Sequence, residues 1–187
     1  MHLSDILATE QLSQRPAHPL RAAPAPAAVA EAAQGDPVGP FRARAAQAMA
    51  LCGAQSAGVS LFDPAGNDEL TWVATTGALA RFEGQRLVRH ASMCGICFEY
   101  RDAQLFIAPH RYFTWMRDLG ILAREALVAP LLGPTGALYG TIWVMAHDGS
   151  DIQFNRQDAS LLSELGKGMY SKVWALEAAG KRSSTRI

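Results

Sequence analysis

The stretch Met93-Cys94-Gly95-Ile96-Cys97-Phe98-Glu99-Tyr100 organises the rest of the chain. It has the composition of an irregular connection, and one short turn separates it from the apolar run Leu105-Phe106-Ile107-Ala108-Pro109-His110. Two strand-like segments precede this stretch and two follow it. Long ordered connections inside a compact domain are commonly binding loops. We therefore expect this stretch to form the wall and lid of a ligand pocket on an antiparallel sheet.

The strands before it are predicted from alternation of apolar and polar residues. Residues 57–62 and 70–76 both alternate, and residues 63–67 between them have strong turn composition, so the two runs form a hairpin or lie close together. Residues 78–92 have some helical character.

The segments after it are predicted in the same way. Residues 104–108 and 125–132 are strand candidates, and Pro130 implies an edge or a bulge in the second. The segment 111–120 between them is expected to be helical. Residues 137–147 form the longest strand candidate, and neither of its faces is polar, so we expect a central strand covered on both sides. Its small even-numbered residues suit close packing of helices, and its large odd-numbered residues suit a pocket.

Two longer helices flank these strands. The first is predicted over residues 40–52, with Pro40 at its start and Gly53 after its end. The last begins after Asn155 as N-cap and runs to Gly180, with an apolar band wider than a single stripe. Either the first helix or a second copy of the chain would cover that band, and we predict a homodimer through the terminal helices.

Composition limits the function classes. The chain has 187 residues, 49% of them apolar, and a formal net charge of zero, which argues against nucleic-acid binding. No apolar run is long enough to span a membrane, and no signal peptide is recognisable. Three cysteines are too few for a disulfide framework, so a cytoplasmic protein is expected.

The domain organisation follows from the same pattern. Residues 1–38 are expected to form a flexible segment rich in alanine and proline, with a short helix near residues 2–14. Residues 39–180 form the domain, and residues 181–187 a polar tail.

Cys94 and Cys97 form a C-x-x-C pair that invites a chemical interpretation. A redox pair needs a site that stabilises the thiolate. A zinc site would need His90 and His110 as well, at a spacing unlike that of a zinc finger. The simpler interpretation is that Cys94 packs under the loop while Gly95 makes the turn, with no metal and no catalytic residue.

Several co-linear elements carry a family resemblance. Residues 52–61 resemble the first strand of the GAF domains of bacterial sensor histidine kinases. Met93-Cys94-Gly95 is similar to their Pro-Cys-Gly element, and residues 108–113 are similar to their Pro-x-Arg-Tyr-Phe element. Residues 127–131, 140–148 and 154–159 resemble their closing strands and helix. Met93 departs from the pattern, which has proline there, and no phosphoacceptor or ATP-binding module is expected after residue 180.

The resemblance implies an α+β fold of the GAF/PAS type. Its central antiparallel sheet would have five or six strands, with the terminal helices on one face and a ligand pocket on the other. Combined with the strand pattern, it gives these candidate pocket residues: Met93, Cys94, Cys97, Phe98, Arg111, Tyr112, Phe113, Trp115, Tyr139, Thr141, Trp143 and Met145.

The function expected from the resemblance is a stand-alone sensory or regulatory module in bacterial two-component signal transduction. It would bind a small molecule without covalent attachment, have no catalytic activity, and act as a homodimer or on a separate output protein. Covalent bilin is not expected, because the chain has no Cys-His dipeptide. The alternative is a thiol oxidoreductase similar to free methionine sulfoxide reductase that uses Cys94 and Cys97. Residues 121–124, where that enzyme class carries its nucleophile, contain no cysteine.

Overall fold

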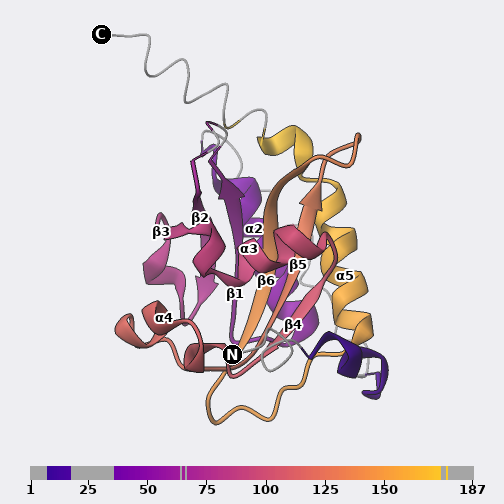
Figure 1. Cartoon of the computed structure of the whole chain (residues 1–187). Coiled ribbons are helices and arrows are strands. Elements are labelled where there is room, and N and C mark those ends of the chain that lie inside the picture. The colour runs from indigo at the N-terminus through magenta and orange to yellow at the C-terminus, as the bar shows by residue number, and fades with distance from the viewer. Residues whose placement is uncertain (1–7, 18–35, 64, 66, 174–175, 177–187) are drawn as a thin grey trace, which may run out of the picture.

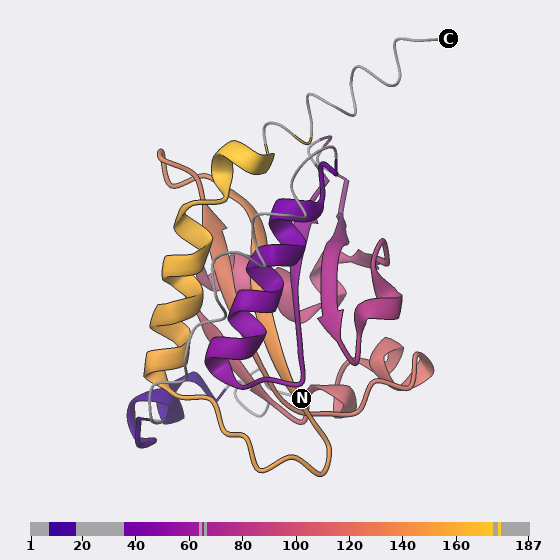
Figure 2. The same ribbon diagram turned by 180° about the vertical axis from the view of Figure 1, so that it is seen from behind.

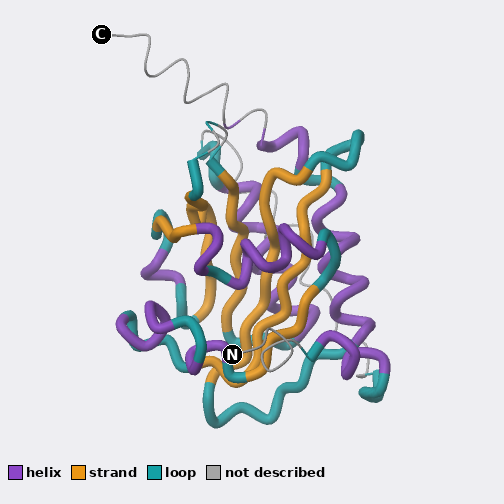
Figure 3. Tube along the Cα trace, viewed as in Figure 1, coloured by secondary structure: helices purple, strands orange, loops and turns teal. Residues whose placement is uncertain are grey.

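The structure is a computed structural model, and it describes residues 8–17, 36–63, 65, 67–173 and 176. An antiparallel sheet runs through the molecule in the order β3-β2-β1-β6-β5-β4 (Figures 1 and 3). Its strands are β1 Ser56–Phe62, β2 Glu69–Gly77, β3 Arg86–Val88, β4 Gln104–Ile107, β5 Ala123–Leu132 and β6 Leu138–His147. The helices are α2 Gly39–Cys52, α3 Met93–Tyr100, α4 Thr114–Asp118 and α5 Arg156–Lys167, with 3-10 turns η2 Thr9–Ser13, η4 Ala80–Phe82, η5 Arg89–Ala91 and η6 Pro109–Arg111. The expected α+β fold is confirmed.

Strand β6 is central, as its apolar faces predicted. It pairs with β1 on one side and β5 on the other. Ile142 and Val144 are fully buried in the cluster that contains residues of α2 and α5, and Trp143 and Met145 are buried in the cluster on the opposite face. Pro130 is accommodated because β4 pairs with β5 no further than Val128, so β5 is an edge at the proline.

Helices α2 and α5 cover one face of the sheet (Figure 2). Helix α2, expected over residues 40–52, begins one residue earlier at Gly39 and ends at Cys52, and the C-cap Gly53 has a left-handed φ of 62°. Helix α5 begins after Asn155, which forms a capping box with Asp158. It ends at Lys167, where Gly168 and Met169 interrupt it, and residues 170–173 and 176 are helical again; the expected end at Gly180 lies outside the described residues.

The apolar band predicted for the last helix, in α5 and the helical residues after it, is covered by the rest of the described chain. Leu162, Leu165, Met169 and Val173 are all buried, and Leu161 packs partly buried against the same cluster. Trp174 lies outside the described residues. The described part of this helix therefore presents no uncovered apolar stripe, and the homodimer stays a prediction.

The opposite face is covered by α3 and α4 (Figure 1). The expectation of an irregular connection over residues 93–100 is wrong: these residues form α3, capped by the Ser92 hydroxyl, which accepts from the Gly95 N–H at 3.1 Å. The weak helical segment expected within residues 78–92 is limited to short 3-10 turns. Residues 78–92 contain η4, η5 and the short edge strand β3, which is the sixth strand of the sheet.

Residues 8–17 pack against the domain, unlike the flexible segment expected there. Ala8 and Leu12 are buried, and the Ala8 N–H donates to the Leu105 carbonyl at 2.9 Å along the outer edge of β4. Residues 1–7 and 18–35 lie outside the described residues, as does the expected polar tail. Within the described part of the chain, no helix is long and apolar enough to cross a membrane.

Candidate functional site

The sheet face beneath α3 and α4 carries a buried, mainly apolar cluster, here called the α3-side core. It consists of Leu70, Trp72, Leu79, Leu87, Met93, Cys94, Cys97, Phe106, Phe113, Met116, Ile121, Ala123, Ala126, Val128, Trp143 and Met145. The structure thus fills with side chains the region where a pocket was expected.

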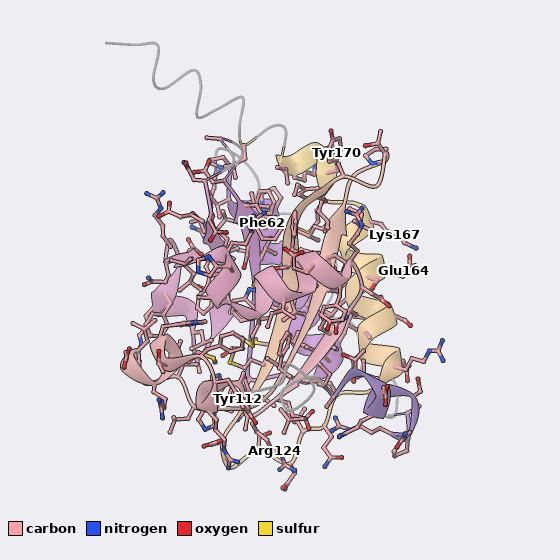
Figure 4. The ribbon with its side chains drawn as sticks, viewed as in Figure 1. Phe62, Tyr112, Arg124, Glu164, Lys167 and Tyr170 are labelled. Atoms are coloured by element: carbon pink, nitrogen blue, oxygen red, sulfur yellow. The ribbon has the colours of Figure 1, made fainter. Side chains whose placement is uncertain are left out.

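Most of the predicted pocket residues meet in this region. Six of them are members of the α3-side core: Met93, Cys94, Cys97, Phe113, Trp143 and Met145. Tyr112 and Trp115 pack partly buried against it, and Thr141 is fully buried. Tyr112 lies at the end of the sheet opposite to Phe62 (Figure 4).

The other three predicted residues, Phe98, Arg111 and Tyr139, lie outside this cluster. Phe98 is half-buried and makes an edge-to-face contact with Phe62, with ring centroids 4.9 Å apart. Arg111 is exposed at the end of η6, so it does not contribute to the buried cluster.

Tyr139 faces the opposite side of the sheet, and its assignment to the pocket face is wrong. The register between β5 and β6 shifts at Leu131/Leu132, which leaves Tyr139 against Tyr170 with ring centroids 5.5 Å apart. Figure 4 places Tyr170 at the far end of the α5 region. A bulge turns a strand residue to the other face, and simple alternation does not reveal it.

Buried polar groups lie in a row across the centre of the α3-side core. Ser60 on β1 pairs in register with Thr141 on β6 and with Trp72 on β2. The Trp143 indole N–H donates to the Ser60 hydroxyl at 3.0 Å, and that hydroxyl lies 3.5 Å from the Cys94 sulfur. The interior therefore contains a small polar centre among apolar side chains.

The two cysteines of α3 are buried thiols. Burial raises the pKa of Cys94, although the neighbouring hydroxyls of Thr141 and Ser60 oppose that rise. Burial also raises the pKa of Cys97 well above its usual range, and the nearby Cys94 and Asp102 add to the effect. The Cys97 thiol lies 3.3 Å from the Asp102 carbonyl and 3.6 Å from that of Val128. Both groups are thiols at neutral pH, which is the unreactive form.

Two polar atoms of this face have no hydrogen-bond partner among the described residues. They are the hydroxyl of Thr141, which is fully buried, and the indole nitrogen of Trp72, which is 2% exposed. The Thr141 hydroxyl is close enough to the Cys94 thiol to oppose the rise of its pKa, but the two groups do not meet the geometry of a hydrogen bond. A buried polar atom without a partner usually costs about 1–3 kcal/mol, so such atoms indicate where a partner is missing.

The zinc interpretation has no geometric support. His90 is paired with Asp68 at the surface, and His110 Nδ1 lies 2.8 Å from the Ala123 carbonyl. In the described ranges, no three histidine, cysteine or carboxylate side chains gather in a way that could hold a metal ion.

Open space lies next to the α3-side core. A groove of about 400 Å³ runs between β3, η5 and α4, and its lining includes Leu87, Ala91, Trp115 and Leu119. A larger hollow of about 580 Å³ lies at the end of β1 and β2, bounded by Tyr139, Phe62 and the charged side chains of Glu69 and Arg86.

The sequence-based reasoning missed Ser60 and Trp72. Ser60 was visible as the one hydroxyl in the predicted strand 57–62, whose other residues carry no polar side chain. For Trp72 the sequence offered no signal, because a tryptophan in a strand is most often ordinary core.

Comparisons with known proteins were made for the whole chain. No family model matches it, and no curated protein matches it. Among solved structures, the GAF-B domain of DevS from Mycobacterium smegmatis is similar, with 25% identity and a TM-score of 0.60 over 79% of this chain and 99% of that domain. The GAF domain of a phosphoenolpyruvate-protein phosphotransferase from Coxiella burnetii has a TM-score of 0.66 at 17% identity, covering 80% of this chain and 89% of that one.

A third similar structure is an enzyme. It is the free methionine-R-sulfoxide reductase of Neisseria meningitidis in complex with its substrate, with 24% identity and a TM-score of 0.60 over 82% of this chain and 86% of the enzyme. At that identity the likeness concerns the fold alone. The six-stranded sheet, the helices on its two faces and these similarities lead to one conclusion: the chain has the GAF fold and resembles the GAF domains of bacterial sensor proteins.

Proposed function

We propose that this chain is a sensory or regulatory module that binds a small molecule between the sheet and the α3–α4 side, without catalysis of its own. The observation that carries the proposal is the polar centre of the α3-side core. Ser60, Thr141 and Trp72 lie side by side on three neighbouring strands, and two of them have a polar atom without a partner in the described part of the chain. A core built only for stability would favour apolar groups at these positions.

The burial of the thiols supports a role without catalysis. A nucleophilic cysteine needs a lowered pKa and access to its substrate. Cys94 and Cys97 are 4% and 0% exposed, and burial shifts both pKa values upward. Thiol oxidoreductase activity is therefore the less favoured function, and reduction of free methionine sulfoxide that is lost in Cys94→Ser would establish it instead.

The test of the proposal begins with the protein as purified. Native mass spectrometry and an absorption spectrum should detect a retained ligand, or a metabolite panel should contain a compound that raises the melting temperature. In Thr141→Val that ligand should bind about tenfold more weakly, because one hydrogen bond is lost. Thr135→Val is the matched control, since Thr135 is exposed in the turn between β5 and β6. If no ligand is retained and no compound shifts the melting temperature, the interior is filled by its own side chains and the proposal fails.

The partners and location follow as further proposals. We propose that the ligand state is passed to a separate output protein of a two-component system in the cytoplasm, and that the module forms a homodimer through its terminal helices. Ligand binding transmits a signal only if it favours one of two arrangements. Light scattering at micromolar concentration, with and without a ligand found as above, measures the mass, and a monomer in both states would rule out the homodimer.

A further inference from the structure

The unpartnered indole N–H of Trp72 lies in a stack of three tryptophans. The Trp72 ring centroid is 4.9 Å from that of Trp143, with the planes tilted by 44°, and 5.9 Å from that of Trp115, with an edge-on angle of 73°. Trp143 uses its own N–H on the Ser60 hydroxyl. The Trp72 nitrogen is therefore the donor in this stack that lacks an acceptor among the described residues.

Trp115 separates Trp72 from the groove of about 400 Å³. It is half-buried, it contacts Trp72 with its ring, and it also lines the groove. Its side-chain hydrogen bond runs from Nε1 to the Ala91 carbonyl at 3.0 Å. Helix α4, which carries it, has five residues, and two residues after its end Gly120 has a left-handed φ of 70°, with no atom within 4 Å of where a Cβ would lie. Met116 on the same helix is fully buried and holds α4 to the core, so it is the half-buried Trp115 side chain that can rotate outward, at the cost of its hydrogen bond to Ala91.

The charge distribution restricts what could enter. Within the described residues, the buried carboxylates are Glu125 and Asp158. Glu125 binds Arg15 and the Phe154 N–H, and Asp158 caps α5, so both belong to the opposite side of the sheet. The charged side chains that line the groove, Arg86 and Asp118, are exposed and opposite in sign. An ion taken into this interior would have no buried counter-charge among the described residues, which makes its transfer from water costly.

We propose that the ligand of this module is an uncharged, flat aromatic molecule with a hydrogen-bond acceptor, and that it enters from the groove by displacing Trp115 from Trp72. Its ring stacks where the Trp115 ring lies, and its acceptor receives the Trp72 N–H. This inference rests on the proposed function, because it names the ligand class for the site that the proposal describes. Aromatic pairs and a satisfied buried donor supply the interaction, and no salt bridge is required.

Three probes of similar shape test the ligand class on the full chain. Quinoline is uncharged near neutral pH and has one ring nitrogen as acceptor, naphthalene lacks the acceptor, and quinoline-2-carboxylate adds a negative charge. Binding is followed by NMR through the indole N–H signals of the four tryptophans, and Trp72→Phe identifies the Trp72 signal. Quinoline should move that signal and bind about tenfold more tightly than naphthalene, and this preference should vanish in Trp72→Phe. Quinoline-2-carboxylate should bind at least tenfold more weakly than quinoline.

Two variants test the displacement of Trp115. Trp115→Ala removes the covering ring and should strengthen quinoline binding severalfold. Arg117→Ala, an exposed change on the same short helix, should leave it unchanged. Equal effects of Trp115→Ala and Arg117→Ala on quinoline binding would overturn the proposed displacement of Trp115.

The remaining outcomes separate this inference from the proposed function. Equal binding of quinoline and naphthalene, a preference that survives in Trp72→Phe, or tight binding of the carboxylate would overturn the ligand class. If none of the probes binds while a charged metabolite is recovered from the purified protein, the ligand class is wrong and the sensory function stands. If no probe binds and nothing is recovered, both fail.

Discussion

Arg15 Nη1 lies 2.8 Å from Glu125 Oε2 and 2.7 Å from the Phe154 carbonyl, so a residue from the N-terminal segment neutralises a carboxylate that is 3% exposed. The same Glu125 oxygen accepts the Phe154 N–H at 2.9 Å. Residues 8–17 thus link β5 to Phe154 and Asn155, the two residues that precede α5. Around this ion pair, Leu12 is buried and the Asn155 side-chain amide donates to the Pro16 carbonyl at 3.0 Å.

Replacing Arg15 by Ala should lower the free energy of unfolding by about 3–5 kcal/mol, because Glu125 would remain buried without its counter-charge. Urea denaturation followed by circular dichroism measures the change. The double variant Arg15→Met, Glu125→Leu should recover most of the loss, since it removes both charges. A loss below about 0.5 kcal/mol in Arg15→Ala would mean that the segment is not held to the domain in solution.

The cysteines should react slowly in the folded protein. Cys52, Cys94 and Cys97 are all buried, and burial raises the pKa of the two on α3. A chromogenic disulfide reagent at neutral pH should therefore modify them only at the rate of unfolding, at least a hundredfold more slowly than in denaturant. Denatured protein serves as the control and should give three thiols per chain. A rapid phase of one thiol in the native protein would contradict the buried site and favour the oxidoreductase.

His147 should make the domain less stable in mild acid. Its Nε2 lies 2.7 Å from the Ser56 hydroxyl, and burial lowers its pKa, although the Leu122 backbone and Asp148 oppose this. Because the unfolded chain then binds the proton more readily than the folded chain, the stabilising contribution is present above the ordinary histidine pKa near 6.5 and is lost as the pH falls. Urea midpoints between pH 5 and 8 measure it. The fall of the urea midpoint toward pH 5 should be shallower in His147→Gln than in the wild type. Identical slopes in the two proteins would contradict the lowered pKa of His147.

Tyr139 should make the domain less stable as the pH rises in alkali, whereas His147 makes it less stable as the pH falls. Burial first, and Tyr170 second, raise its pKa to about 12. The unfolded chain loses this proton near pH 10, so the stabilising contribution is present below pH 10 and is lost as the pH rises toward about 12. Urea midpoints between pH 9 and 11.5 should therefore fall more steeply in the wild type than in Tyr139→Phe.

The same variant tests the buried hydroxyl. No partner for the Tyr139 hydroxyl occurs in the described residues, so Tyr139→Phe at neutral pH should raise the free energy of unfolding by up to about 1 kcal/mol. Tyr100→Phe is the control and should have no effect, because Tyr100 is 52% exposed. A loss of more than about 1 kcal/mol in Tyr139→Phe would show that the hydroxyl has a partner.

Five of the six strands were predictable from the sequence, because their signals are local, whereas the short strand β3 gave no such signal. Alternation in residues 57–62 and 70–76, together with the turn residues between them, fixes a hairpin wherever it lies in the molecule. The two apolar faces of residues 137–147 required a central strand, and Asn155 and Asp158 start α5 through hydrogen bonds within one turn. The structure confirmed these elements, and the similar solved structures confirmed the resemblance to GAF domains.

The details of the site depend on tertiary packing, which the sequence pattern does not reveal. Helix α3 gave no clear periodic pattern because it has only eight residues and its first three, Met93, Cys94 and Gly95, are all buried. A Cβ on Gly95 would lie 1.9 Å from the Arg89 carbonyl oxygen, a constraint that no local pattern reveals. The bulge between Val59 and Ser60 sets which residues of β1 and β2 are neighbours, and a second bulge moves Tyr139 to the other face. Which polar atoms meet in the interior, and which lack a partner, depends on strand register and on packing between segments distant in sequence. These contacts form only when the strands pair and the helices pack on the sheet, so no local sequence pattern encodes them.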